Sequence, residues 1–125
     1  MTKSRGRIAI VDDDASVCRA LRRLIRSLGM DAETFPSARE FLDRVAALPP
    51  FDMDCLILDV HMPRMSGLEL QTRLGRAGRP IIFITAHDDR DARDQALAAG
   101  ALAFLHKPLD EASLIESLER ALAPK

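Results

Sequence analysis

The sequence predicts an α/β protein in which helices cover both faces of a parallel sheet. Two observations carry this prediction. Short apolar runs alternate along the chain with segments of helical periodicity. Most of these runs are apolar at nearly every position, which is typical of parallel strands buried on both faces. The chain has 125 residues, so we expect a single domain spanning 1–125, with about 6–123 ordered.

Five segments are expected to form strands. Four of them are rich in Ile, Leu and Val, namely "RIAIV" (7–11), "CLIL" (55–58), "PIIFI" (80–84) and "ALAFL" (101–105). The remaining segment, "MDAETF" (30–35), alternates between apolar and polar residues. Such alternation favours an edge strand for 30–35.

Helical patterns separate these strands. In the first, Val17, Leu21, Leu24 and Leu28 recur at helical spacing, and Gly29 follows as a terminating residue. The other helices are expected from a capping box at Ser37–Glu40 to Pro49–Pro50, from about Gly67 to Arg76, from about Asp91 to Ala99, and from Asp110 to Leu122. Right-handed crossovers and the chain length then favour a flavodoxin-like (βα)5 three-layer sandwich with strand order 2-1-3-4-5.

The helix at 91–99 differs from the others in what it buries. Its inward residues are expected to be Ala92, Ala96, Leu97 and Ala99, which offer little apolar area. We therefore expect this helix to be held loosely. Tight packing of alanines against the sheet would explain the same composition.

Composition excludes several classes of protein. The formal net charge is −1, so no global field attracts nucleic acid or an anionic membrane. The N-terminal apolar run is too short for a signal peptide or a membrane span. Cys18 and Cys55 have no metal-type spacing, and we interpret them as buried, reduced thiols of a cytoplasmic protein.

Polar side chains gather where the predicted strands end. The first strand runs into Asp12, Asp13 and Asp14, the third ends at Asp59, the fourth at Thr85, and Lys107 follows the fifth. In a parallel sheet of this order, these ends meet at the edge where ligands bind. Asp14 has a simple structural explanation, as a favourable charge at the start of a helix. Thr85, taken singly, is explained equally well as an ordinary β-branched strand residue. The other residues predict a shallow, negatively charged pocket.

Electrostatics indicates what this pocket lacks. Two like charges about 5 Å apart at an effective dielectric constant of about 20 repel by roughly 3 kcal/mol. The single ammonium of Lys107 does not offset Asp12, Asp13 and Asp59, so either a proton is retained or a divalent cation binds. Carboxylate oxygens without a nearby thiol favour Mg²⁺ or Mn²⁺. Such an ion keeps waters that a phosphoryl group can displace.

Together these motifs resemble the receiver (CheY-like) domain of bacterial two-component response regulators. The resemblance runs from Ile8 to Leu122 and is carried by "VDDD" (11–14), "LILDVHMPRMSGLEL" (56–70), "ITA" (84–86), "AGA" (99–101) and "FLHKP" (104–108). Each motif is weak alone; in this order, at strand ends, they are specific. The sequence is most similar to receivers of the nitrogen-fixation (FixJ/LuxR) type, which are joined to a C-terminal helix-turn-helix.

The resemblance implies a role for each matching residue. Asp59 would accept a phosphoryl group from a phosphohistidine of a sensor histidine kinase. Asp13, Asp59 and the backbone carbonyl of His61 would hold Mg²⁺, with Asp12 contacting it through water. Lys107 would pair with a phosphoryl oxygen and precede a cis peptide bond to Pro108. Thr85 and the backbone N–H of Ala86 would bind the phosphoryl group, and Phe104 would turn inward as the switch residue.

Two features fall outside this pattern. His61 and His87 should face each other over the site, where they would tune phosphoryl lifetime or recruit a softer inhibitory ion; two solvated histidines are the simpler interpretation. The first predicted helix carries a basic stripe at Arg19, Arg22, Arg23 and Arg26. The stripe is either a solvated face or a docking surface for the kinase.

The leading functional interpretation is a phospho-acceptor switch rather than an enzyme. A Mg²⁺-dependent phosphatase or transferase with an aspartyl-phosphate intermediate is the alternative, but His61 stands where such enzymes usually carry a second acid. A flavin-binding module lacks support because the chain has no Trp or Tyr. The output would be transcriptional, through a C-terminal DNA-binding domain, a partner or a phosphorylation-dependent homodimer, with no direct contact of this domain to nucleic acid or membrane. The chain would be either a whole protein or an excised receiver.

Overall fold

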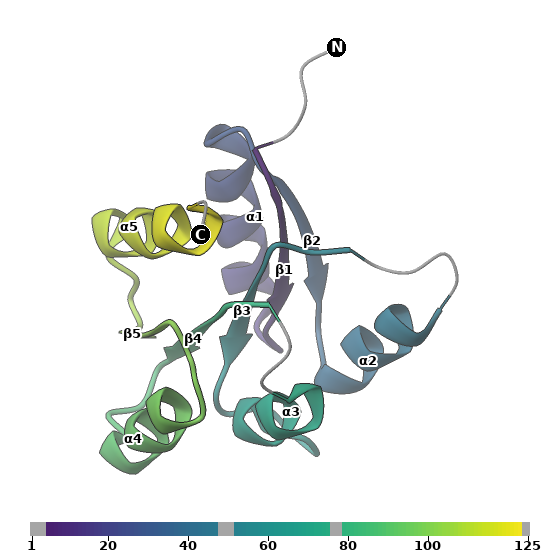
Figure 1. The fold of residues 1–125 in the computed structure, drawn as a ribbon, viewed down its shortest axis with the longest axis vertical. Helices are drawn as coiled ribbons and strands as arrows, with labels where there is room; N and C mark the ends of the chain where they lie inside the picture. Colours follow the sequence, from purple (N-terminus) through teal and green to yellow (C-terminus); the bar gives the residue numbers. More distant parts are fainter. Residues whose placement is uncertain (1–4, 48–51, 76–78, 124–125) are drawn as a thin grey trace.

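Five strands and five helices alternate along the chain (Figure 1). The computed structural model describes residues 5–47, 52–75 and 79–123. The elements are β1 (Arg7–Val11), α1 (Ala15–Ser27), β2 (Asp31–Phe35), α2 (Ala38–Ala46), β3 (Cys55–Asp59), α3 (Gly67–Leu74), β4 (Ile81–Thr85), α4 (Arg90–Ala98), β5 (Ala103–His106) and α5 (Glu111–Leu122). The predicted succession of elements is thus confirmed.

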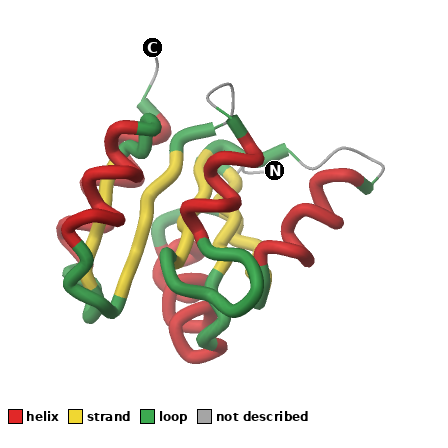
Figure 2. The backbone as a smooth tube through the Cα atoms, turned by 90° about the horizontal axis from the view of Figure 1, so that it is seen from below, coloured by secondary structure: helices red, strands yellow, loops and turns green. Residues whose placement is uncertain are grey.

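The strands form one parallel sheet in the order β2-β1-β3-β4-β5, as the sequence predicts. Viewed from below, the helices lie on both sides of the strands (Figure 2). Helices α1 and α5 pack on one face, and α2, α3 and α4 pack on the other. The order places β2 at an edge, in agreement with its alternating sequence, and makes a (βα)5 sandwich of three layers.

Each central strand contributes to two hydrophobic cores. Ile8 and Ile10 of β1 face α1 and α5, whereas Ala9 and Val11 of the same strand face the other three helices. Successive side chains of a strand point to opposite faces, so a strand covered on both sides must be apolar throughout. This requirement explains the continuous runs 7–11, 55–58 and 80–84.

The fifth predicted strand differs from its prediction. The run 101–105 was expected to be covered on both faces, but β5 is Ala103–His106 and lies at an edge of the sheet. Its residues Ala103, Phe104 and Leu105 are only half-buried. An apolar run is therefore found in a half-buried edge strand as well as in a central strand, and apolarity alone does not distinguish the two.

The helix starts follow local capping signals. Asp14 accepts hydrogen bonds from the backbone of Ser16 (2.9 Å) at the start of α1. Ser37 accepts from the N–H of Glu40 (3.1 Å), which is one half of the predicted capping box. At the ends, Gly29 follows α1 with a φ of 84°, a conformation that glycine adopts without strain. Pro49–Pro50 and Arg76, expected to end α2 and α3, lie outside the described residues.

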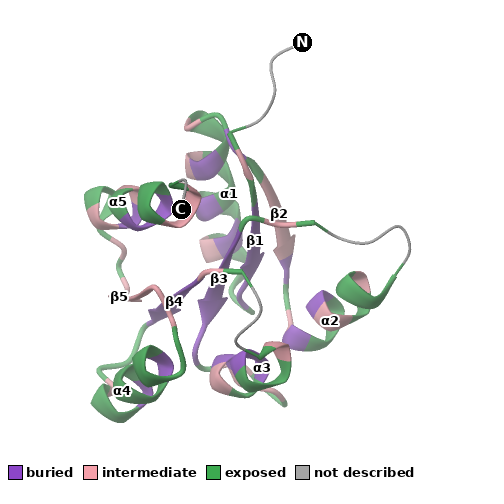
Figure 3. Cartoon of the chain, in the orientation of Figure 1, coloured by how far each residue is buried: buried purple, intermediate pink, exposed green. Residues whose placement is uncertain are grey.

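Helix α4 buries less than the sequence suggests. Ala92 and Ala96 are buried, but Leu97 is 39% exposed and Ala99 is exposed as well. The prediction that Leu97 and Ala99 face inward is therefore wrong. Ala92 and Ala96 are four residues apart and share one face, whereas Leu97 lies about 100° around the helix from Ala96. Figure 3 shows α4 exposed along most of its surface.

Three smaller expectations concern single residues and the membrane. The thiols of Cys18 and Cys55 are free and buried. The Lys107–Pro108 peptide bond is cis. Among the helices of the described residues, none combines the length and apolarity needed to cross a membrane.

Candidate functional site

Three carboxylates meet at the carboxyl end of the sheet. Asp12 and Asp13 follow β1, and Asp59 is the last residue of the neighbouring strand β3. One oxygen from each lies within 4.8 Å of the others. Asp12 is fully buried and Asp59 is 4% exposed, whereas Asp13 is open to solvent. The sequence predicted this convergence from strand order alone.

Lys107 reaches this cluster from the turn after β5. Its Nζ donates a hydrogen bond to Asp12 Oδ2 (2.9 Å) and lies 3.7 Å from Asp59 Oδ1. The other oxygen of Asp12 accepts from the backbone N–H of Asp14 (2.9 Å). Both oxygens of Asp12 thus have hydrogen-bond donors. Asp59 has a longer, weaker contact with the ammonium.

The environment of Asp59 opposes its ionisation. Burial, followed by the negative charge of Asp12, raises the pKa of Asp59 from 3.8 to about 7. Lys107 and a hydrogen bond from the backbone of His61 lower this pKa but do not restore its ordinary value. Near neutral pH, the protein by itself therefore keeps Asp59 only partly ionised. Additional positive charge at this position would make the carboxylate fully available.

Lys107 remains a cation in this pocket. Partial burial works to lower its pKa, but the hydrogen bond to Asp12 and the charges of Asp59 and Asp12 outweigh that effect. The pKa of Lys107 is therefore held above its ordinary value. A permanent ammonium beside a buried carboxyl group suits the binding of an anionic group.

The donor set of the cluster fits a hard divalent cation. All three side chains offer carboxylate oxygens, which Mg²⁺ and Mn²⁺ prefer. Cys18 lies nearby, but its thiol donates to the backbone oxygen of Asp12 (3.2 Å). Burial raises the pKa of Cys18 to about 11, so this sulfur is not a thiolate ligand. A cation bound here would lower the raised pKa of Asp59, because its positive charge would stabilise the ionised carboxylate.

Thr85 is the last residue of β4, the strand next to β3. The residue is fully buried, and its Oγ1 accepts a hydrogen bond from the N–H of His87 (3.1 Å). Its backbone oxygen accepts from the N–H of Lys107 (2.7 Å), which links β4 to the Lys107 turn. Ala86, the next residue, is exposed. Thr85 therefore connects the pocket with the loop that leads into α4.

Phe104 lies on β5, beside the strand that ends in Thr85. Its ring is half-buried, with its centroid 6.1 Å from that of Phe83. Phe104 is thus partly packed against the core that includes Ala92 and Ala96 of α4. The ring of Phe104 therefore lies at the boundary between the core and the solvent.

Sequence reasoning missed the structural role of Gly67. A Cβ at this position would lie 2.2 Å from the backbone oxygen of Asp59 and 3.1 Å from the Phe83 ring. The N–H of Gly67 donates to the oxygen of Val60 (2.8 Å), which holds the start of α3 against the end of β3. The available signal was a glycine directly after Ser66, where a capping box with Glu69 begins α3.

The two histidines at the mouth of the pocket do face each other. The rings of His61 and His87 have centroids 4.7 Å apart and an interplanar angle of 81°. His61 Nε2 also lies 3.4 Å from Asp89 Oδ2, a partner that the sequence did not reveal. Asp89 is the N-cap residue of α4, so its contact with His61 joins the loop after β3 to the start of α4.

Comparison with known proteins agrees with this geometry. Residues 8–119 match the family described as "Response regulator receiver domain". A crystal structure of a response regulator receiver protein from Burkholderia phymatum superposes with a TM-score of 0.86 at 50% identity, covering 96% of this chain and 95% of that one. The site thus lies in a fold that recurs in proteins of this description.

Two curated relatives extend the comparison. Response regulator protein TmoT of Ectopseudomonas mendocina is 44% identical over 98% of this chain and 55% of its own length. Transcriptional regulatory protein FixJ of Bradyrhizobium diazoefficiens is 35% identical over 95% of this chain and 58% of its own length. The chain therefore spans about half the length of these relatives. With its strand order, its acidic cluster and these matches, it belongs to the receiver domain family of two-component response regulators.

Proposed function

We propose that the protein is a phospho-acceptor switch in which Asp59 takes a phosphoryl group from the phosphohistidine of a sensor histidine kinase. The observation that carries the proposal is the position of Asp59. It is a nearly buried carboxylate at a strand end, flanked by Asp12 and Asp13 and faced by the Lys107 ammonium. A nucleophile and a binding site for anionic oxygens thus lie in one pocket.

The transfer forms one bond and breaks another. An ionised oxygen of Asp59 attacks phosphorus, and the phosphorus–nitrogen bond of the phosphohistidine breaks with its electron pair going to nitrogen. Because the other ring nitrogen of that phosphohistidine is already protonated, the imidazole leaves as a neutral base. Lys107 pairs with one phosphoryl oxygen, while the Thr85 hydroxyl and the Ala86 N–H bind others. The hydrogen bond that Thr85 now accepts from His87 leaves its own O–H available as a donor.

The proposed cofactor is Mg²⁺ or Mn²⁺. Asp13, Asp59 and the carbonyl of His61 would hold the ion, with Asp12 in water-mediated contact. When bound, it supplies positive charge that keeps Asp59 ionised and neutralises the oxygens of the incoming group. This assignment is supported by the oxygen-only donor set and by the raised pKa of Asp59.

The signal would leave the site through the loop after β4. Attraction of the Thr85 hydroxyl toward a phosphoryl oxygen would disturb its hydrogen bond with His87 and vacate space for Phe104. Both movements lead to the face formed by α4, β5 and α5. Helix α4 buries only two alanines, so a small free energy would suffice to displace it.

The test is phosphorylation by acetyl phosphate with Mg²⁺, followed by intact mass measurement. We expect wild type to gain one phosphoryl group and Asp59→Asn to gain none. Asp13→Asn should react slowly because its metal ligand is lost, and an excess of chelator should slow the wild type in the same way. Phosphorylation of Asp59→Asn at the wild-type rate would refute the assignment of the acceptor.

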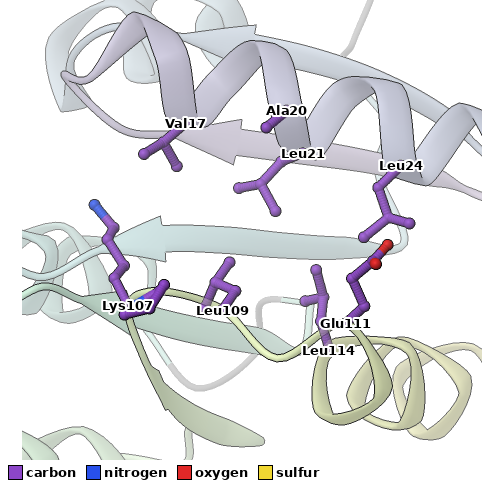
Figure 4. A pocket seen from close by; sticks show the side chains of 9 residues that line it. Val17, Ala20, Leu21, Leu24, Lys107, Leu109, Glu111 and Leu114 are labelled. Carbon is purple, nitrogen blue, oxygen red and sulfur yellow. The ribbon is translucent and has the colours of Figure 1, made fainter.

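We further propose that the kinase docks over a groove between α1 and α5. The groove encloses about 300 Å³, and its lining is mainly apolar (Figure 4). The lining residues are Val17, Ala20, Leu21, Leu24, Lys107, Pro108, Leu109, Glu111 and Leu114. Because Lys107 belongs both to this groove and to the acidic pocket, a helix seated here would bring its phosphohistidine next to Asp59.

The basic stripe of α1 offers a second set of contacts for an acidic partner. Arg19, Arg22, Arg23 and Arg26 are all exposed. Reversing the charge of Arg22 and Arg23 should slow transfer from the kinase but leave phosphorylation by acetyl phosphate unchanged. Equal transfer rates from the kinase would remove the docking role and leave a solvated polar face.

The output is proposed from the relatives, because the chain spans only about half their length. Relatives such as FixJ are described as transcriptional regulatory proteins. We propose that this receiver acts in the cytoplasm on a C-terminal DNA-binding domain, a partner or a second copy of itself. The protein would not act as an enzyme with multiple turnovers. Rapid, repeated release of phosphate from a phosphorylated substrate would favour the alternative, a phosphatase with an aspartyl-phosphate intermediate.

A further inference from the structure

Three side chains with metal-binding atoms lie outside the acidic cluster but beside it. His61 comes from the loop after β3, His87 from the loop after β4, and Asp89 is the N-cap residue of α4. All three belong to the mouth of the pocket rather than to its floor. His61 is 45% and Asp89 is 34% exposed at the side chain, and His87 is exposed as well. Nothing in the proposed phosphoryl transfer requires either imidazole.

The distance between His61 and Asp89 is informative. A charge-assisted hydrogen bond between an imidazole and a carboxylate is about 2.7–2.9 Å long. Here Nε2 and Oδ2 are 3.4 Å apart, which is long for such a bond. Two ligands of a tetrahedral ion with bonds of about 2.1 Å are separated by about 3.4 Å. The pair therefore already has the spacing of two ligands of one tetrahedral metal ion.

His87 is within reach as a third ligand. Its ring centroid is 4.7 Å from that of His61, and the two rings are nearly perpendicular. The ring is exposed, so rotation about its side-chain bonds meets little resistance. Among the described residues, the acidic cluster is the only group of three that is preassembled, so the histidine group needs this rotation to close.

We propose that His61, His87 and Asp89 form a second cation site, which takes a borderline-soft divalent ion of the Zn²⁺ class. Two imidazoles and one carboxylate are a common ligand set for zinc, with the fourth position open to water. Mg²⁺ prefers oxygen ligands and would remain in the acidic cluster. The two sites would share only His61, whose carbonyl is assigned to the cluster and whose ring belongs to the new site.

Occupation of this site would fasten α4 to the loop after β3. Asp89 can serve both purposes, because Oδ1 accepts the capping hydrogen bond from the N–H of Ala92 (2.9 Å) and Oδ2 points to His61. Helix α4 would thus keep its cap when the metal binds. Since α4 buries only Ala92 and Ala96, one metal link would restrain a helix that packing holds weakly.

The proposal is tested by calorimetric titration of the whole chain with Zn²⁺ in the presence of excess Mg²⁺. We expect one Zn²⁺ per chain, with affinity reduced at least about tenfold in His61→Gln and in His87→Gln. Asp89→Asn keeps a capping acceptor and should weaken binding without loss of the helix. These residues lie at the exposed mouth of the pocket, and circular dichroism of each variant verifies the fold.

Two variants serve as matched controls. His106→Gln removes the third histidine of the chain, whose Nδ1 lies 2.9 Å from the oxygen of Lys107, and should bind Zn²⁺ as wild type does. Asp13→Asn removes an acidic-cluster ligand and should also retain the Zn²⁺ affinity. If affinity falls with Asp13→Asn but not with the histidine variants, the ion sits in the acidic cluster and the proposal is wrong. Equal loss in His106→Gln, or no binding at all, also overturns it.

Discussion

Helices α1 and α4 both cover the same sheet, yet they are attached by different means. Helix α1 spans Ala15–Ser27 and buries Cys18, Leu21 and Ile25. Helix α4 spans Arg90–Ala98 and buries only Ala92 and Ala96. Burial of one Leu or Ile side chain stabilises a protein by about 1.5–3 kcal/mol, whereas a single methyl contributes about 0.8 kcal/mol. Figure 3 shows the difference as buried turns along α1 and a largely exposed α4.

Helix α4 buries little apolar surface, and polar contacts contribute to holding it in place. Gln71 of α3 is buried and donates a hydrogen bond from Nε2 to the oxygen of Ala96 (3.1 Å). At the other end, Asp89 caps the helix and lies beside His61. Such contacts are directional and individually modest, so they can be exchanged at low cost. The comparison shows that buried side chains anchor α1 to the sheet, whereas α4 is held by two buried alanines and a few polar contacts.

The largest expected effect comes from truncating a large buried side chain of α1. Ile25→Ala should lower the free energy of unfolding by about 2–5 kcal/mol, because Ile25 is fully buried and its truncation leaves a cavity. Leu97→Ala in α4 should change it by less than about 0.5 kcal/mol, since that side chain is 39% exposed. Urea unfolding of the two variants measures the contrast. Equal losses would mean that α4 is anchored as firmly as α1.

The acidic cluster at the end of the sheet should carry a stability cost that depends on pH. The pKa of Asp59 is about 7 in the folded protein and 3.8 as its ordinary value, so the folded state binds an extra proton between these limits. Stability conferred by this proton is lost as pH rises from about 4 to about 7. Without divalent cations, Asp59→Asn should therefore be more stable than wild type above pH 7, by roughly 2–4 kcal/mol.

At acidic pH the difference in stability between wild type and Asp59→Asn should disappear. Below pH 3.8 Asp59 is protonated in both the folded and the unfolded protein, so Asn and Asp should differ little there. Thermal unfolding of both proteins with chelator across this range provides the measurement. Added Mg²⁺ should stabilise wild type near neutral pH but stabilise Asp59→Asn less. A difference between the two proteins that is constant with pH would contradict the raised pKa.

A smaller effect is expected from the polar link between α3 and α4. Gln71→Leu keeps most of the side-chain volume but removes the hydrogen bond to Ala96, at a cost of about 1 kcal/mol. The change should appear mainly as faster hydrogen exchange of the α4 amides, with the α1 amides unaffected. Arg73→Ala on the exposed face of α3 is the matched control. Faster exchange across the whole chain would show that Gln71 supports the global fold rather than α4.

The helix caps should give the most local difference. Asp14→Ala and Asp89→Ala each remove a side-chain acceptor at a helix start, which costs about 0.5–2 kcal/mol. In α1, buried Leu21 and Ile25 should keep the helix protected against exchange. In α4, loss of Asp89 should expose the whole helix to exchange. If Asp14→Ala opened α1 to the same extent, packing would not be what distinguishes the two helices.

The architecture and the carboxylate floor of the site follow from patterns that are visible in the amino-acid sequence. Continuous apolar runs required strands covered on both sides, and the strand order then brought Asp12, Asp13, Asp59 and Lys107 to one edge. This inference works because strand periodicity is local and because parallel strands end at one side of the sheet. The facing of His61 and His87 was predicted in the same way, from loops at neighbouring strand ends.

Other features were decided only by the tertiary structure. Gly67 has no local reason to be glycine until the backbone of Asp59 is placed against it. The same holds for the pairing of Asp89 with His61 and of Gln71 with Ala96, which join residues far apart in sequence. The exposure of Leu97 depends on how α4 is rotated on the sheet. Contacts between elements depend on the distance and rotation of packed layers, and no short stretch of sequence specifies these.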